Sequence, residues 1–546
     1  MERPVWRRPA VRILASLLVL AIVLGLGGCG GSDKPAGEPK KPAEEPKTPA
    51  VAPKVPQIAV YAYHSEPVIF WDPADVFSNE IIVMNNAYEQ LIQFDPATKK
   101  FVPVLAENYQ VSKDGLVWTF NLRKGVKFHC GEPMNAAAVK YSIDRTIQRG
   151  KGASFIWSQV KEIKTPDENT VEFHLKVPAP LDFIAAAGYS AFVYCPKHAK
   201  EFGTDWFGQG NTCGTGPYKV ESWKRGDEVV MTRFNDYWRG WSGNHLDKAI
   251  IKMVPEPSTR RQMLESGQAD YCNEMPFEDI GALANNPKIE ILTTPSYQML
   301  MALFNMDKPP LNNKLVRQAI SYAIPYDDIV KHVFHGYATQ SKGAVPQGLW
   351  GHDDSLPQYA YDLEKAKSLL AKAGYPNGGF KIVLTYVGGD EKERQVAELM
   401  KSELAKLNIQ MDIRGMPWDA QWEMGKAKQP KDRQDIFLFY WWPDLADPYS
   451  FLNAVFHSEK EIVFNLSYYK SREFDRLIDE ANSVAGADRA KAISLYSQAQ
   501  KTLIEDAPAA WVADLQYVRP KIANLKGVRD NPAYPHVLFF YDAYRE

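Results

Sequence analysis

Residues 115–145 read Gly115-Leu-Val-Trp-Thr-Phe-Asn-Leu-Arg-Lys-Gly-Val-Lys-Phe-His129 and then Cys130-Gly-Glu-Pro-Met-Asn-Ala-Ala-Ala-Val-Lys-Tyr-Ser-Ile-Asp-Arg145. The first part alternates between two faces, and Leu116, Trp118, Phe120 and Leu122 all fall on the same one. This period of two is typical of a half-buried strand. Lys124-Gly125 supplies a turn. The sequence therefore predicts a strand, a turn and a short second strand.

A helix is predicted directly after this hairpin. Asn135 is a favourable N-cap residue, and Val139, Ile143 and Ile147 recur every four positions. Such spacing is expected on the buried side of a helix. We therefore expect these three side chains to face the core.

Two further strings carry the same kind of information. Cys213-Gly-Thr-Gly-Pro-Tyr-Lys-Val220 is a tight turn entering a strand, and Met263-Leu-Glu-Ser-Gly-Gln-Ala-Asp270 is a helix end closed by Gly267. Together with residues 115–145, they resemble the signatures of extracytoplasmic solute-binding proteins of the peptide/nickel class, which serve ABC importers. Cys130 stands where these proteins usually have Asp, and Ala138 where they usually have an acidic residue.

The resemblance implies an α/β, two-lobed periplasmic-binding-protein-like fold of type II, cluster C-like, with an extra N-terminal subdomain. A chain of 546 residues is too long for one hydrophobic core. Near residue 275 the pattern becomes rich in helices, and it returns to strands after 505. In the family that the chain resembles, the chain crosses between the lobes twice, and these shifts fit that layout. The resemblance thus implies lobe I at 58–95, 196–275 and 506–546, an inserted subdomain at 96–195, and lobe II at 276–505.

Within the expected lobe II, the pattern indicates a strand–helix–strand unit with a parallel pair. Its parts are Phe380–Tyr386, a helix around 394–407, and Ile409–Ile413. Residues 471–505 predict two more helices, broken near Gly486.

The N-terminus predicts export. Residues 1–29 combine a basic start, an apolar run and Leu26-Gly27-Gly28-Cys29, which matches the bacterial lipobox with Cys29 as the lipidated residue. The alternative, an uncleaved anchor helix, requires a longer apolar run. Arg7-Arg8 is a weak hint of twin-arginine export, so the route stays open. Residues 30–57 are dense in Pro, Lys, Glu and Ala and predict a disordered tether.

These features place the protein outside the cytoplasm, lipid-anchored to the outer face of the cytoplasmic membrane or in the periplasm. Its 64 basic residues balance 66 acidic ones, and no basic stripe stands out, so no nucleic-acid partner is expected. No catalytic motif and no cofactor motif is recognisable. A surface-anchored hydrolase is therefore a remote alternative.

Four cysteines remain after Cys29. We expect a disulfide between Cys195 and Cys213, which flank one loop, although four cysteines allow three pairings. None shows metal-site spacing, and no bound metal is expected.

His332 and His335 are one helical turn apart, but their place before Gly336 is typical of a helix C-terminus.

The predicted ligand platform is Phe439-Tyr-Trp-Trp-Pro-Asp-Leu-Ala-Asp-Pro-Tyr-Ser-Phe-Leu452. Ile436–Tyr440 predicts an apolar strand, and Pro443 and Pro448 restrain the loop after it. In peptide-binding members of the family, an acidic residue of a similar string pairs with the ligand's α-amino group. The matching position is Asp444. The alternative is that Asp444 braces its own loop, a role that we assign to Asp447.

The resemblance also implies main-chain pairing between a peptide and Tyr440, Trp441 and Trp442. Other expected ligand contacts are Phe77, Ser78 and Trp418, with Trp418 preferred over Trp422. The residue that would receive a peptide carboxylate is not identifiable, since Leu438 occupies a position where a relative has a basic one.

The sequence thus predicts a monomeric, non-enzymatic binding lipoprotein that captures di- or oligopeptides between two lobes and delivers them to the permease and ATPase subunits of an ABC importer. The alternative on the same scaffold is an oligosaccharide or a nickel chelate as ligand.

Overall fold

A computed structural model describes residues 56–546 of the chain. The predicted signal segment 1–29 with Cys29, and the predicted tether up to residue 55, lie outside the described residues. Within 56–546, no helix is both long and apolar enough to cross a membrane.

The segment around residue 120 folds largely as predicted. β5 (Val117–Leu122) buries Trp118, Phe120 and Leu122 on one face. α2 (Ala136–Arg149) starts after Asn135, whose side chain accepts a hydrogen bond of 3.0 Å from the backbone N–H of Ala138. The predicted short second strand is reduced to one bridge, between Lys127 and Pro133.

One expectation about this helix was wrong. Ile147 is 38% exposed, whereas Thr146 is buried. Positions four apart drift by about 40° around a helix with 3.6 residues per turn, so the third member of such a series leaves the buried face. The buried stripe therefore continues from Val139 and Ile143 to Thr146.

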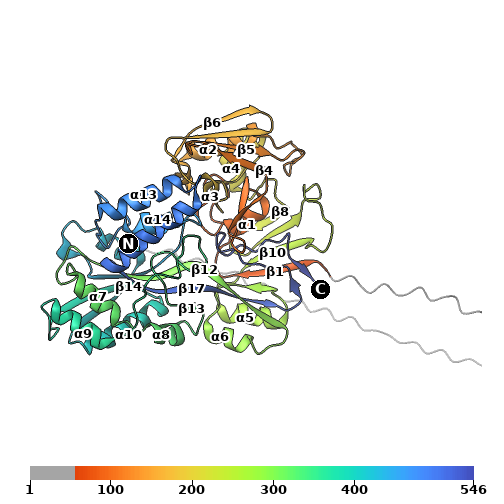
Figure 1. Cartoon of the computed structure of the whole chain (residues 1–546). Helices are drawn as coiled ribbons and strands as arrows, with labels where there is room; N and C mark the ends of the chain where they lie inside the picture. The colour runs from red at the N-terminus through yellow and green to blue at the C-terminus, as the bar shows by residue number, and fades with distance from the viewer. Residues whose placement is uncertain (1–55) are drawn as a thin grey trace, which may run out of the picture. The chain divides into compact units, whose positions relative to one another are not determined.

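β5 belongs to a small antiparallel sheet in the order β4-β5-β7-β6, on which α2 packs (Figure 1). The predicted strand Thr170–Leu175 is confirmed as β7. The elements of this region are β2 (Ile92–Asp95), β3 (Lys100–Pro103), β4 (Ala106–Val111), η1 (Ser154–Trp157), β6 (Val160–Asp167), α3 (Leu181–Ala185) and α4 (Pro196–Gly208).

A large mixed sheet has the strand order β15-β14-β16-β12-β17-β11-β1-β10-β9-β8, with β13 also paired to β17. Its strands are β1 (Ile58–Tyr63), β8 (Tyr218–Lys224), β9 (Glu228–Arg233), β10 (Lys248–Met253), β11 (Tyr271–Cys272), β12 (Ile289–Phe304), β13 (Ala338–Thr339), β14 (Lys381–Val387), β15 (Gln410–Met416), β16 (Ile436–Trp441) and β17 (Ala509–Ile522). The predicted parallel pair is confirmed by the register of β14 with β15, joined through α10 (Glu391–Ala405).

The remaining helices cover this sheet and extend beyond it. They are α1 (Ile81–Ala87), α5 (Pro257–Ser266), α6 (Phe277–Leu283), α7 (Lys314–Tyr322), α8 (Tyr326–Asp328), η2 (Ile329–Val333), α9 (Leu363–Lys372), α11 (Trp418–Gly425), η3 (Pro430–Asp432), α12 (Tyr449–Phe456), α13 (Arg472–Val484) and α14 (Arg489–Asp506). α13 and α14 are the two predicted helices. A last pair of short strands is β18 (Leu525–Lys526) and β19 (Tyr544–Arg545).

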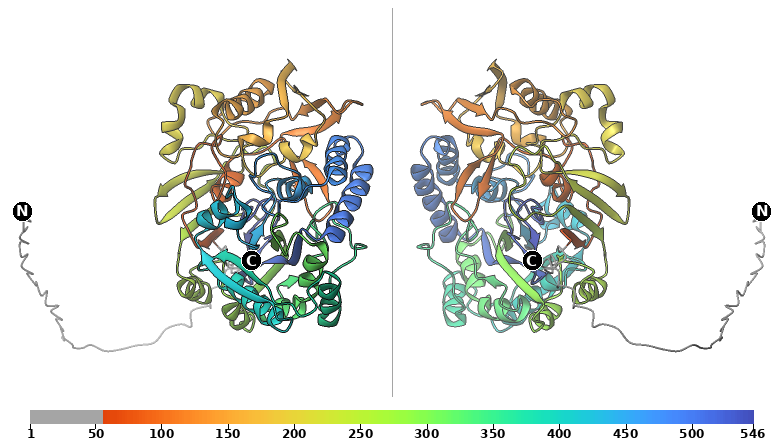
Figure 2. Two further views of the ribbon diagram at one scale, coloured as in Figure 1. Left: turned by 90° about the vertical axis from the view of Figure 1, so that its left-hand side faces the viewer. Right: turned by 90° about the vertical axis from the view of Figure 1, so that its right-hand side faces the viewer.

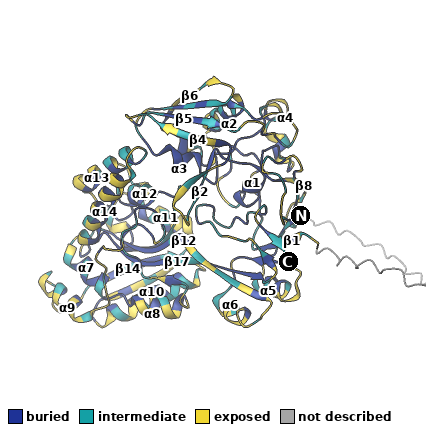
Figure 3. Cartoon of the chain, turned by 45° about the vertical axis from the view of Figure 1, so that its right-hand side comes forward, coloured by how far each residue is buried: buried dark blue, intermediate teal, exposed yellow. Residues whose placement is uncertain are grey.

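The long strands β12 and β17 form one antiparallel ladder from Ile289 to Leu303. Their alternating side chains enter two cores. Leu300, Ala302 and Phe304 pack in one core with α7, α9 and α10, whereas Met299, Met301 and Leu303 pack in the other with α12 to α14. In Figure 2 the blue helices α13 and α14 accordingly lie apart from the green α7 and α9. Figure 3 shows that these helices carry both buried and exposed residues along their length.

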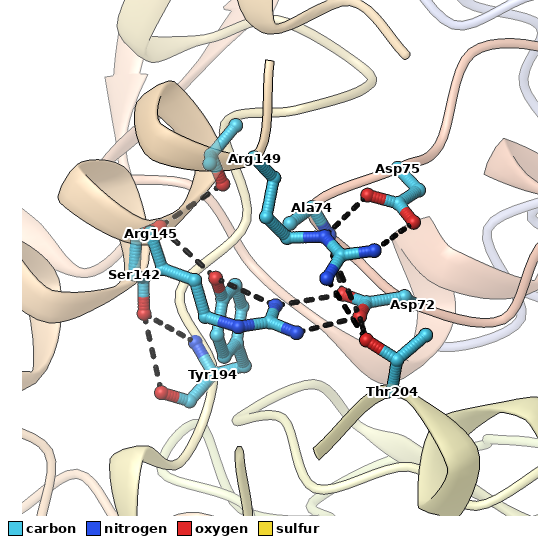
Figure 4. A network of polar contacts seen from close by, with 9 residues as sticks. Asp72, Ala74, Asp75, Ser142, Arg145, Arg149, Tyr194 and Thr204 are labelled. Carbon is cyan, nitrogen blue, oxygen red and sulfur yellow. Dashed lines mark hydrogen bonds and ion pairs between the residues drawn. The ribbon is translucent and has the colours of Figure 1, made fainter. Parts of the chain in front are cut away.

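A charged network ties α2 to the loop after Trp71 (Figure 4). Arg145 donates two hydrogen bonds to Asp72, at 2.7 and 2.6 Å, and Arg149 pairs with Asp75. Thr204 of α4 donates to the same Asp72 carboxylate at 3.1 Å. Burial alone would raise the pKa of Asp72, but the hydrogen bonds and charge of Arg145 outweigh it and lower that pKa overall. The network therefore stabilises the fold at neutral pH and weakens as acid protonates Asp72.

We predict that Arg145→Met lowers the free energy of unfolding by about 3 kcal/mol at pH 7, because it leaves a buried carboxylate short of its main partner. The difference from the unaltered protein should shrink as the pH falls below the ordinary pKa of aspartate. Urea unfolding at several pH values measures this. Lys140→Met on the same helix is the matched control, since its pair with Asp144 is partly exposed and should contribute no more than about 0.5 kcal/mol. Equal losses in both variants would contradict the role of the network.

Candidate ligand-binding site

The strand predicted at Ile436–Tyr440 is confirmed as β16. It pairs antiparallel with β12, and Trp441 lies opposite Met299. The loop after it is held by Asp447, whose carboxylate accepts a hydrogen bond of 2.7 Å from the backbone N–H of Tyr449. Trp350 adds a hydrogen bond from its indole N–H to the carbonyl of Ala446 at 3.0 Å. The loop is therefore fixed by Asp447 from within and by Trp350 from a distant segment, and Asp447 has the bracing role predicted for it.

Asp444 differs from Asp447 in that its carboxylate has no such role. Within residues 56–546, no hydrogen bond or ion pair reaches the Asp444 side chain, while its backbone carbonyl accepts a 2.6 Å hydrogen bond from the hydroxyl of Tyr189. Burial raises the pKa of Asp444 to about 6, and no cation among the described residues opposes this shift. A half-buried carboxylate without a counter-charge is a site suited to a cationic ligand group.

Tyr189 brings distant parts of the chain to this loop. Its ring centroid is 6.1 Å from that of Phe77, and Phe77 also lies 6.3 Å from Phe155 in an edge-on contact. Phe77 is 50% exposed, so it offers an uncovered aromatic surface next to the Asp444 loop. Tyr189 was missed by the sequence reasoning, because nothing in its neighbourhood marks it apart from other buried aromatic residues.

Ser78 follows Phe77 and is exposed. Its backbone N–H donates to the carboxylate of Glu80 at 2.9 Å, and the same carboxylate accepts from the N–H of Phe70 at 3.1 Å. Glu80 is fully buried, so it sets the path of the loop that presents Phe77 and Ser78.

A second aromatic group is formed by residues of β16 and of α11, which precedes it in the chain. Trp418, at the start of α11, stacks on Phe439 with a centroid separation of 6.4 Å, and Phe439 meets Trp441 at 6.0 Å. Trp418 is 44% exposed, whereas Trp422 is partly buried against Phe437.

The two tryptophans at the end of β16 differ in their surroundings. Trp441 donates its indole N–H to the carbonyl of Ser450 at 3.0 Å and is half-buried. Trp442 is 55% exposed. Tyr440 points to the opposite core, and burial raises the pKa of its hydroxyl well above the usual value. These positions give Trp442 the more accessible ring and give Trp441 and Tyr440 a packing role alongside any binding role.

A polar cluster near β17 was not predicted. Arg519 donates to His536 at 3.0 Å and lies over the ring of Tyr517 at 4.2 Å, and His64 is held by Asn273 at 2.9 Å. Burial lowers the pKa of His536 to about 3, so this ring is neutral at ordinary pH. The members come from three distant parts of the chain, at 64, 273 and 517–536, and share no motif, so a single sequence offers no signal for them.

The predicted disulfide between Cys195 and Cys213 is not formed in the structure. All four cysteines among the described residues carry free thiols, and Cys130 lies 3.5 Å from Cys195, sulfur to sulfur. Sequence spacing did not reveal that Cys130 joins the other two.

His332 and His335 do not converge. His332 lies 4.0 Å from Asp328, and His335 lies 3.7 Å from Glu278, on another helix.

The fold is α/β on one large mixed sheet, and the loop after its inner strand β16 carries a carboxylate, Asp444, that has no cationic partner among residues 56–546. This arrangement suits the binding of a small solute, and comparison with known proteins identifies the class. Residues 100–461 match the family model described as bacterial extracellular solute-binding proteins, family 5. The chain belongs to this family, whose members are the solute-binding components of ABC importers of the peptide/nickel class, and its type II periplasmic-binding-protein fold agrees with that.

Several named proteins are similar to this chain over most of its length. The "Probable D,D-dipeptide-binding periplasmic protein DdpA" of Escherichia coli is 30% identical over 85% of this chain and 90% of its own length. Heme-binding protein A of Haemophilus influenzae is 29% identical over 84% of this chain and 86% of its own length. The periplasmic binding protein DppA of Helicobacter pylori, solved in complex with peptide STSA, is 27% identical, with a TM-score of 0.72 over 90% of this chain and 98% of that one.

The raised pKa of Asp444 predicts a pH-dependent gain in stability for Asp444→Asn. The folded-state pKa of about 6 lies above the ordinary value of roughly 4, so ionisation between these pH values favours the unfolded chain. The variant should equal the unaltered protein below about pH 4 and exceed its unfolding free energy by on the order of 2 kcal/mol above about pH 6. Thermal unfolding across this range measures the difference.

Asp419→Asn, an exposed position on α11, is the control and should show no such trend. A constant offset for Asp444→Asn at every pH would contradict the assignment.

Proposed function

We propose that this protein is the peptide-binding component of an ABC importer and that it holds the free amino terminus of a peptide at Asp444. The observation that carries the proposal is the half-buried Asp444 carboxylate, whose pKa is raised by burial and which no cation from residues 56–546 neutralises. A ligand ammonium group supplies the missing charge, and an uncharged ligand end leaves the carboxylate unpaired. Relatives named for dipeptide binding, and a structure holding a peptide, support this ligand class.

Main-chain pairing is the second part of the proposal. Among the described residues, β14 pairs with β16 only at Ile436 and Phe437, so the outer edge of β16 near Trp441 is not used by β14. A peptide lying along this edge toward Asp444 gains backbone hydrogen bonds that do not depend on its side chains. Exposed Trp442, Trp418 and Phe77 then offer apolar surface to varied side chains, with Ser78 beside them. Such a site favours broad specificity.

Closure about the long strands is the mechanism that we propose for capture. We assign lobe I to 58–95, 196–275 and 506–546, lobe II to 276–505, and the inserted subdomain to 96–195. The ladder of β12 with β17 shifts register between Pro295 and Met299, and Tyr297 between them has a φ of 56°. An interrupted ladder is a suitable place for a bend between lobes. Tyr189 with Asp444, and Asp182 with Arg489 at 2.6 Å, are then contacts that opening breaks.

We propose that Cys29 carries the lipid that anchors the chain outside the cytoplasmic membrane, that the protein acts as a monomer, and that it has no catalytic activity. It delivers its ligand to permease subunits driven by their ATPases. An oligosaccharide or a nickel chelate is the competing ligand on the same scaffold.

The experiment compares free and N-acetylated forms of the same peptides by calorimetry at pH 7.5. For Asp444→Asn, affinity for free peptides should fall by at least about 30-fold, or ~2 kcal/mol, because the ammonium group loses its charged partner. Acetylated peptides should bind weakly to both proteins and show little difference between them.

Asp419→Asn controls for the general effect of removing a negative charge. The role of Asp444 is refuted if Asp444→Asn lowers the affinity for free and acetylated peptides by the same factor, or if it lowers neither affinity. Binding of a sugar or nickel chelate, with no response to any peptide, would move the function to the competing ligand.

A further inference from the structure

Three cysteines and one histidine converge at one point away from the Asp444 loop. Cys130, Cys195, His198 and Cys213 each offer a ligand atom, and these four atoms all lie within 4.8 Å of one another. The sulfurs of Cys130 and Cys195 are 3.5 Å apart. The residues come from three separate segments, so this convergence is produced by the tertiary fold.

Each segment is positioned by its own backbone. Cys130 lies in the tight turn closed by Gly131, whose N–H donates to the carbonyl of Phe128 at 2.8 Å. Cys195 is the N-cap residue of α4, and His198 follows in the first turn of that helix. Cys213 directly precedes Gly214.

Backbone hydrogen bonds also join the three segments to one another. The N–H of Cys195 donates to the carbonyl of Cys213 at 3.1 Å, and the N–H of His129 donates to the carbonyl of Gly214 at 2.8 Å. The imidazole of His129 contacts the carbonyl of Gly216 at 2.9 Å. The four ligand atoms are therefore held together by a built framework and not by flexible surface side chains.

The four side chains of the cluster have donor atoms that are free to bind an ion. Nδ1 of His198 is shielded from solvent and has no hydrogen-bond partner among the described residues. Cys195 and Cys213 are buried, whereas Cys130 is exposed and gives an ion a route to the cluster. A disulfide between any two of the thiols would leave the third thiol and His198 without a role.

The ligand set and its dimensions fit one class of ion. Three thiolates and one imidazole are the ligands of structural zinc, with Zn–S of about 2.3 Å and Zn–N of about 2.0–2.1 Å in a tetrahedral site. Ligand atoms of such a site are roughly 3.4–3.8 Å apart, which follows from those bond lengths. The cluster spans at most 4.8 Å, so only small side-chain movements are needed.

We propose that Cys130, Cys195, His198 and Cys213 bind one Zn²⁺ ion that joins the turn after β5, the start of α4 and the segment before β8. The thiols release their protons on binding, and the ion remains in the same oxidation state. The site has no open coordination position, so its role is structural. This inference does not depend on which solute the protein carries.

The test uses the full chain, purified from the cell envelope without reducing agent or added metal. Elemental analysis together with intact mass should give one zinc per chain and no disulfide. Cys213→Ser and Cys130→Ser should each bind less than about a tenth of the zinc, and chelation should lower the melting temperature of the unaltered protein. Cys272→Ser is the matched control, because Cys272 is buried beside Arg260, its sulfur 3.6 Å from that residue's backbone carbonyl, and should keep the full amount.

A second measurement covers the case in which the variants fail to fold. In the unaltered protein, zinc should protect Cys130 from alkylation, and removal of zinc by a chelator should make this exposed thiol react. Cobalt in place of zinc should give the absorption of a tetrahedral thiolate complex. A disulfide among these three cysteines in the isolated protein, zinc retained in Cys130→Ser, or reduced protein that fails to take up zinc or cobalt would each overturn the proposal.

Discussion

The antiparallel ladder between β12 and β17 is the constraint on which the rest of the structure depends. These two neighbouring strands lie in the middle of the large sheet and pair along most of their length, from Ile289 to Leu303 of β12. Their alternating side chains divide the interior into two cores, one beneath α7 to α10 and one beneath α12 to α14. Because β16 pairs with β12, the same ladder also places the end of β16 and the Asp444 loop beside the register shift.

The site combines a fixed scaffold with an unsatisfied charge. Asp447, Trp350 and Tyr189 form hydrogen bonds with backbone groups of the loop. The side chain of Asp444 is therefore not needed to hold the loop in place. The ionised Asp444 carboxylate lowers the free energy of unfolding, because burial without a cationic partner raises its pKa to about 6. A ligand that brings an ammonium group removes this disadvantage, so binding and stability are opposed at one residue.

Local patterns predicted local structure well. The alternation of β5, the Asn135 cap, the parallel pair of β14 and β15 and the strand β16 all followed from residue periodicity and capping chemistry. Ile147 failed because a strict four-residue repeat drifts around a helix. Tyr189, the Arg519 cluster and the meeting of Cys130 with Cys195 and Cys213 were not foreseen, since each depends on contacts between segments far apart in sequence. Asp444 was found through its motif, whereas its lack of a partner required the structure.

The most direct test of the account is native mass spectrometry of the exported protein, purified without refolding, with identification of whatever it releases. The account predicts a set of short peptides with free amino termini, lost when Asp444 is replaced by Asn. Release of a sugar, a metal chelate or another non-peptide solute, retained in that variant, would contradict the assignment of Asp444 as the group that holds a peptide's amino terminus.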